Sequence, residues 1–170
     1  MTKNNKIPQR SPQVNRPTAK KMDTSSKEVD MNYLKSFYPT PVKGMKWVYA
    51  MTISIQGMNI QGEMIMEVTE VLGEDVKLSI AIGAQRHEES LNINSFAPVP
   101  NASGKKDSTG YTYEGQESLN LPYKALDTTK LSTPNNDGKG YLWLAHGIGP
   151  VKFGISQAGV PATLELKSFS

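Results

Sequence analysis

The stretch Tyr141-Leu-Trp-Leu-Ala-His-Gly-Ile-Gly-Pro-Val-Lys-Phe153 carries the clearest structural signal in this chain of 170 residues. An apolar run leads into a Gly-Ile-Gly-Pro break at 147–150, and a second run with apolar edges follows it. After a Gln-Ala-Gly turn at 157–159, residues 160–169 alternate apolar and polar side chains. Because glycine and proline mark turns and a period of two is typical of half-buried strands, residues 141–169 predict three strands joined by turns.

The same alternation continues upstream through most of the chain. Six apolar side chains occupy every second position of the first long strand: Met45, Trp47, Tyr49, Met51, Ile53 and Ile55. Shorter alternating runs at 64–68 and 76–82, separated by turns at 57–59 and 73–75, predict a three-stranded antiparallel meander. A strand with weaker alternation is expected at 86–96, and residues 98–110 read as a long polar loop.

The remaining segments carry weaker signals. Residues 32–38 are expected to form one helical turn or a short docking segment, and 111–114 and 118–121 are expected to be short strands. Residues 122–134 fit a helical turn or a strand, and a tight turn is expected at 135–140. No convincing helical period of ten or more residues occurs. The sequence therefore predicts an all-β fold, a mainly antiparallel curved sheet or partly open barrel.

The first thirty residues differ from the rest in composition. Large apolar side chains are isolated there, and seven Lys or Arg stand against three Asp or Glu, whereas residues 31–170 have twelve basic and thirteen acidic residues. Such a segment buries too little apolar surface to offset the entropy of ordering. We predict a disordered basic tail at 1–30, most simply a solvated tether, and a single β-rich domain at 31–170.

Composition excludes several classes of site and segment. The chain has no cysteine, so it has no disulfide, thiolate nucleophile or cysteine metal site. No apolar h-region of a signal peptide and no run of about twenty apolar residues is present, so a soluble chain is expected. These features fit a cytoplasmic or an exported protein and leave the compartment open.

The residue types that carry catalysis lack partners at local spacing. His87 lies beside two glutamates and His146 precedes the glycine turn, and neither has a positioned acid–base partner nearby in sequence. Glu63 and Glu67 share a strand face but read as a solvent-facing carboxylate row. Alignment of the 135–140 turn with a calcium loop places Leu144 where the bidentate glutamate belongs, so calcium is not predicted. We expect a protein that is not an enzyme and has no metal site or cofactor.

The methionines and aromatic residues of the strands have two interpretations. As core residues they fill space, and as one wall of a concave sheet face they form an adaptable apolar surface for a ligand. The candidate ligand-binding residues are Trp47, Tyr49, Met51, Met64, Met66 and Trp143. Basic residues do not interleave with the strand aromatics, so nucleic acid is not an expected partner.

Three stretches of the sequence also carry a resemblance to a known group. The opening strand Gly44-Met-Lys-Trp-Val-Tyr49, the late hairpin at 141–153 and the closing Leu164-Glu-Leu166 resemble a loose group of bacterial β-rich proteins, many of them exported proteins or lipoproteins. Their shared pattern is a G-x-x-W-x-Y opening strand and a Tyr-led strand that runs into G-x-G-x-V-K. The resemblance covers about residues 40–169, and the group is loosely similar to the curved sheets of lipoprotein carriers. It implies an envelope or extracellular location, although no leader is expected from residues 1–30 and the sequence contains no cysteine for lipidation.

Two functions follow as expectations. The first is a non-catalytic binding or interaction module that binds a small hydrophobic ligand or a protein partner. The resemblance suggests a bacterial cell-envelope assembly as its setting. The alternative is a structural subunit of a larger assembly, tethered through the basic tail and able to form oligomers. A concave, unfilled sheet face would favour the first, and a flat sheet with a filled core and exposed edges the second.

Overall fold

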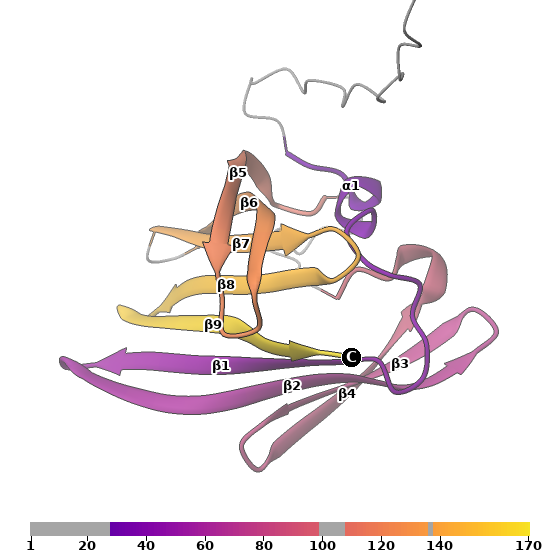
Figure 1. Cartoon of the computed structure of the whole chain (residues 1–170), viewed down its shortest axis with the longest axis horizontal. Coiled ribbons are helices and arrows are strands. Elements are labelled where there is room, and N and C mark those ends of the chain that lie inside the picture. Colours follow the sequence, from indigo (N-terminus) through magenta and orange to yellow (C-terminus); the bar gives the residue numbers. More distant parts are fainter. Residues whose placement is uncertain (1–27, 99–107, 136–137) are drawn as a thin grey trace, which may run out of the picture.

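Nine strands and one short helix make up the part of the chain that the structure, a computed structural model, describes: residues 28–98, 108–135 and 138–170 (Figure 1). The elements are α1 (Met31–Lys35), β1 (Lys46–Ile55), β2 (Met58–Leu72), β3 (Asp75–Ile82), β4 (Gln85–Asn92), the 3-10 turn η1 (Ile93–Ser95), β5 (Thr112–Asn120), β6 (Ala125–Asn135), β7 (Gly138–Ala145), β8 (Gly149–Gln157) and β9 (Val160–Phe169). The predicted tail, most of the 98–110 loop and the centre of the 135–140 turn lie outside the described residues.

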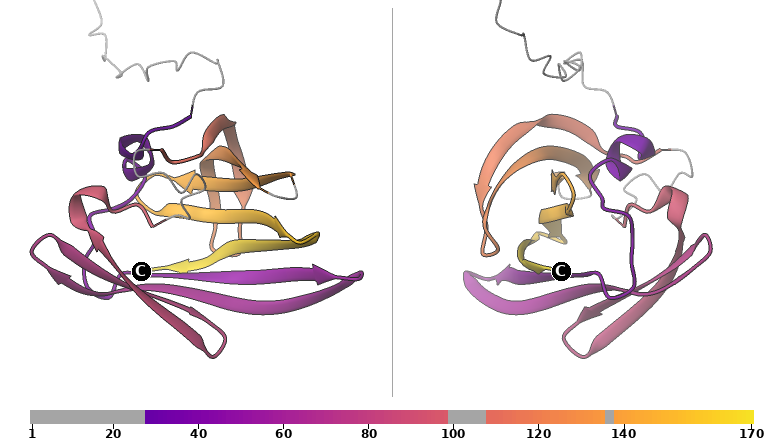
Figure 2. Two further views of the ribbon diagram at one scale, coloured as in Figure 1. Left: turned by 180° about the vertical axis from the view of Figure 1, so that it is seen from behind. Right: turned by 45° about the vertical axis from the view of Figure 1, so that its right-hand side comes forward.

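All nine strands form one antiparallel sheet in the order β4-β3-β2-β1-β9-β8-β7-β6-β5. The chain builds one meander from β1 outward to β4, and a second from β5 back to β9, which pairs with β1. The sheet curls without closing, so β4 and β5 are its edge strands (Figure 2). The predicted all-β fold is confirmed, in its curved-sheet form rather than as a barrel.

The N-terminal segment spans the space between the two edges. Glu28 bridges to Thr112 of β5 and the amide of Val29 donates to the carbonyl of Tyr111, while α1 contacts η1, which follows β4. Asp30 caps the helix by accepting the amide of Tyr33, and Leu34 and Phe37 are buried. Residues 32–38, expected to form one helical turn or a short docking segment, contribute to the short helix α1 and pack against the domain. Residues 28–30, which the sequence assigned to the tail, are part of this packed segment.

Several strand limits differ from the predicted ones for local reasons. β2 begins at Met58 because the turn has two residues, Gln56 and Gly57, both with positive φ, as tight hairpins require. β5 is one strand with an irregularity at Gly115, whose φ of 151° lets the backbone bulge without breaking. The ambiguous 122–134 segment becomes β6, and the strand expected at 86–96 ends at Asn92, whose side chain caps η1.

The core occupies one half of the concave face. Segments 28–38 and 93–98 and the β7–β8 turn at 146–149 cover that half, and we call them the plug. Gly149 of the turn has φ of 90°, and a Cβ there would lie 2.7 Å from the Tyr38 ring. The close approach of the two segments therefore requires glycine at this position.

Candidate functional site

Burial falls steadily along the concave face of β1. Trp47 and Tyr49 are fully buried beneath the plug, Met51 and Ile53 are half-buried, and Ile55 is 37% exposed. These five side chains share a face because strand residues alternate. The plug thus covers the first half of the strand and leaves its second half open.

Strands on both sides of β1 repeat this gradient. In β2, Val68 and Met66 are buried, Met64 is half-buried, and Ile60 and Met58 are exposed by 51% and 65%. In β8, Val151 is buried, whereas Ile155 farther along the strand is 44% exposed. In β9, Leu166 is buried and Ala162 is half-buried. The open half is therefore a continuous surface across several strands.

The part of this open half nearer the core forms an apolar groove of about 890 Å³, whose lining includes Ile53 but not Met58 or Ile60. Residues of β1, β2, β3, β4, β8 and β9 line it, with two from neighbouring loops: Met51, Ile53, Met64, Met66, Ile80, Ile82, Glu89, Leu91, Pro98, Phe153, Ile155, Ala158, Val160, Ala162 and Leu164. The volume lies within the range of about 300–1,000 Å³ usual for small-molecule sites.

The local sequence keeps this groove wide and adaptable. Gly62 pairs with Met51 across β1 and β2, and a Cβ at Gly62 would lie 2.7 Å from the Met51 Cε. The Met51 side chain therefore lies in the space that Gly62 leaves free. Methionine has no branch and three rotatable bonds, so this part of the wall can adjust to ligands of different shape.

Three of the six sequence-predicted ligand-binding residues line the groove: Met51, Met64 and Met66. Trp47 and Tyr49 lie on the same sheet face but under the plug. The Trp47 Nε1 donates to the carbonyl of Ile148 at 2.7 Å, and the Tyr49 hydroxyl donates to that of Pro150 at 2.7 Å. Their place in the core makes them supports of the groove rather than parts of its wall.

Trp143 lies on the opposite, convex face. It pairs with Lys152 of β8 and Lys130 of β6, and both ammonium groups lie over its ring, at 5.4 and 5.1 Å from the centroid. Its Nε1 donates to Glu117 at 2.5 Å. Adjacent residues of a strand point to opposite faces. Leu142 pairs with Phe153, which lines the groove, so its neighbour Trp143 faces away from the other five predicted residues.

Charge is concentrated away from the groove. Among the described residues that line the groove, only Glu89 is charged, and it belongs to the edge strand β4. On the convex face, Lys46 pairs with Glu67 at 3.0 Å, and Lys167 with Glu63 at 3.0 Å. The carboxylates that the sequence placed on a solvent-facing row thus have lysine partners there.

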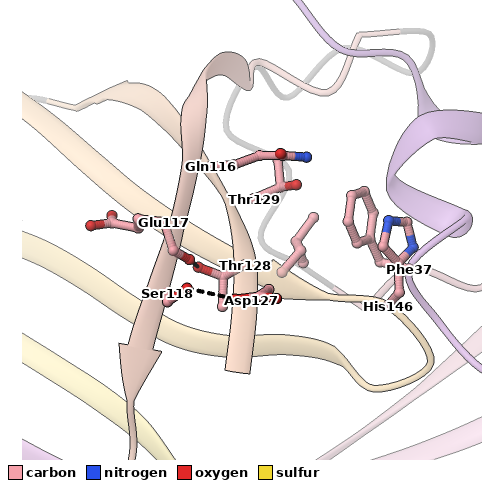
Figure 3. A pocket seen from close by; sticks show the side chains of 9 residues that line it. Phe37, Gln116, Glu117, Ser118, Asp127, Thr128, Thr129 and His146 are labelled. Atoms are coloured by element: carbon pink, nitrogen blue, oxygen red, sulfur yellow. Dashed lines mark hydrogen bonds between the residues drawn. The ribbon is translucent and has the colours of Figure 1, made fainter. Parts of the chain in front are cut away.

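A second, smaller cleft of about 300 Å³ is lined by polar residues together with Phe37 and Leu144 (Figure 3). Ser118 of β5 donates to the Asp127 carboxylate of β6 at 2.5 Å, and His146 stacks on Phe37 with ring centroids 4.2 Å apart. Serine, aspartate and histidine therefore line one cleft. The hydrogen bonds of the described residues join serine directly to aspartate, however, and none reaches His146, so the geometry of a nucleophile with its base is not formed here.

The described residues show neither a metal site nor a membrane-spanning helix. Within residues 28–98, 108–135 and 138–170, no group of three His, Asp or Glu is placed to hold a metal ion. In the same ranges, no helix has the length and apolar character needed to span a bilayer. A non-catalytic role remains a prediction, and the groove is the candidate site.

Three buried tyrosines are expected to make the folded protein less stable at alkaline pH. Burial raises the pKa of Tyr111 to about 12 from 10.0, and burial raises the pKa of Tyr38 and Tyr49 well above 10.0. Above about pH 10 the unfolded chain loses these protons while the folded protein keeps them, so the unfolded state binds fewer protons. The contribution of these tyrosines to the free energy of unfolding is fully present below about pH 10. It is lost as the pH rises through their pKa values in the folded protein.

We expect urea titrations above about pH 10 to show a free energy of unfolding that falls by up to about 1.4 kcal/mol per pH unit for each such tyrosine. Tyr111→Phe should remove one tyrosine's share of this slope. An unchanged slope in that variant would contradict the assignment.

Sequence reasoning missed much of the groove wall. Ile80, Ile82, Phe153, Ile155 and Ala162 line it but were taken only as parts of strands. The available signal was their alternation, which places each on one face of its strand. The pairing of β1 with β9, about 110 residues apart in the chain, was needed to join these faces into one surface.

Comparisons with known proteins give only distant structural similarity. The sequence matches no protein-family model and no curated protein. A presumed exported protein with a YmcC-like fold from Bacteroides fragilis superposes with a TM-score of 0.46 at 12% identity, over 79% of this chain and 98% of that one. A presumed lipoprotein from Parabacteroides distasonis gives 0.45 at 13%, over 79% and 98%. A DUF1329 family protein from Desulfovibrio piger gives 0.27 at 10%, over 82% and 88%.

Proposed function

We propose that the groove binds a small elongated apolar ligand, such as the acyl chain of a lipid, and that the protein acts as a non-catalytic binding module. The observation that carries the proposal is the half of the concave face that none of the described residues fills. In an ordinary sheet the whole concave face would be packed, because exposed apolar surface is unfavourable in water. Here about 890 Å³ lined by methionine and aliphatic side chains is left open beside a filled core.

The chemistry of the wall favours an acyl chain over a polar ligand. Hydrophobic contact is not directional, and the wall supplies few hydrogen-bonding groups to orient a sugar or a nucleotide. Methionines such as Met51 and Met64 can follow a flexible chain. Glu89 at the β4 edge would repel an anionic headgroup, so a neutral lipid fits this site best.

A competition experiment tests the proposal. We expect the neutral probe N-phenylnaphthylamine to bind with increased fluorescence and to be displaced by monoolein. Burying about ten methylenes is worth about 8 kcal/mol, which corresponds to a Kd near 1 µM before the costs of association. We therefore expect a Kd for monoolein between about 1 and 100 µM.

Native mass spectrometry separates this proposal from the structural-subunit alternative. A co-purified small hydrophobic mass supports ligand binding. A defined oligomer together with no saturable probe binding would contradict it and favour assembly, for which the edge strands β4 and β5 offer pairing sites. An envelope or extracellular location stays a prediction that this experiment does not require.

A further inference from the structure

Two adjacent hairpins at one end of the sheet carry no charged side chain. Residues 50–62, around the β1–β2 turn, and 153–164, around the β8–β9 turn, contain no Asp, Glu, Lys, Arg or His. Ile53 of β1 pairs with Ile60 of β2 on one side and with Ala162 of β9 on the other, so the hairpins lie side by side. Both turns lie at the left-hand end of the sheet in Figure 1. We call residues 53–60 and 155–160 the hairpin end.

The two faces of the hairpin end differ in polarity but not in charge. On the concave face, Ile55, Met58, Ile60 and Ile155 are 37%, 65%, 51% and 44% exposed. On the convex face, uncharged polar groups pair with one another, as in the hydrogen bond from the Ser54 Oγ to the Asn59 Oδ1 at 2.7 Å. Large exposed apolar side chains therefore gather where formal charge is absent.

We propose that the hairpin end docks on the surface of an uncharged lipid bilayer, from which an acyl chain enters the groove. Charged side chains are costly inside a bilayer, and apolar ones gain by leaving water, so a charge-free apolar end suits a hydrocarbon surface. A protein partner would more often meet a rim with charged residues. The inference rests on the proposed function, since it names the source of the ligand.

The groove and the hairpin end are continuous. Ile53 and Ile155 line the groove and also belong to the hairpin end, and Ile55 follows Ile53 on the same face of β1. A chain that leaves the bilayer here reaches Met51 and Met64 without passing a charged side chain of either hairpin.

Vesicle flotation tests the docking with a matched pair of variants. Met58 and Leu72 are the first and last residues of β2, and they are 65% and 60% exposed. With vesicles of phosphatidylcholine alone, we expect Met58→Glu/Ile60→Glu to bind at least about tenfold more weakly than the wild type, because both glutamates would be desolvated at the membrane. Leu72→Glu should bind as the wild type does. Binding should change little with salt, since no charge takes part.

Three results would overturn the docking: no flotation of the wild type, equal losses in the two variants, or flotation only with anionic lipid that disappears at high salt. The last would assign membrane binding to basic residues. N-phenylnaphthylamine binding in solution tests the groove separately, and Met58→Glu/Ile60→Glu should retain it. Flotation without probe binding would therefore reject the proposed function, whereas probe binding without flotation would reject the docking.

Discussion

Trp47→Ala is expected to lower the free energy of unfolding by about 3–5 kcal/mol, the usual cost of removing a large buried aromatic side chain. Trp47 is fully buried, and its ring packs near Phe96 and Phe169 with centroids 6.5 and 5.4 Å away. Its Nε1 also donates to the carbonyl of Ile148, in the β7–β8 turn of the plug. The substitution leaves a cavity and removes the donor of that carbonyl, so both losses contribute to the change.

Two further variants separate the effect of the cavity from that of the lost hydrogen-bond donor. Urea denaturation should be followed by circular dichroism, because substitution of Trp47 removes a tryptophan that fluorescence would report. Trp47→Phe keeps most of the apolar volume but not the N–H, and should cost about 1–3 kcal/mol. Val48→Ala, at the next position on the convex face, should cost less than Trp47→Ala because Val48 is only half-buried. A loss below about 1 kcal/mol for Trp47→Ala would show that the plug is held without this residue.

Ala162→Trp is expected to weaken monoolein binding by roughly a hundredfold while leaving the fold intact. Ala162 lines the groove and pairs with Ile53 of β1 and Ile155 of β8, so an indole there would occupy the middle of the groove. Excluding about four methylenes of a ligand costs about 3 kcal/mol. Aromatic residues suit strands, and the position is only half-buried, so the sheet should accept the change.

Thr163→Trp is the matched control. Thr163 is the next residue of β9, faces the convex side and is exposed. It receives the same side chain at nearly the same place in the chain, but outside the groove. We expect monoolein to displace N-phenylnaphthylamine from this variant as it does from the wild type. Equal losses in both variants, or no loss in Ala162→Trp, would contradict binding in the groove.

The sequence predicted the strands well where alternation was strong and less well where backbone geometry decided. β1 and β3 follow from apolar side chains at every second position, a local property of the chain. The bulge at Gly115 and the cap that Asn92 forms on η1 interrupt that pattern, so β5 and the end of β4 were placed imperfectly. For the candidate site, Met51, Met64 and Met66 were identified from residue type, while Trp143 was grouped with them although it faces the other side.

The local sequence is sufficient to predict antiparallel strands with one apolar face, because apolar residues recur at every second position. It also determined that residues 50–62 and 153–164 carry no charge. The division of the apolar face into core and groove does not follow from the local pattern. That division depends on contacts between segments far apart in the chain, in which Tyr38 meets Gly149 and Trp47 meets Ile148. The described residues of the plug cover Trp47 but not Met51. Trp47 therefore lies in the core and Met51 in the groove, although both belong to the same alternating run.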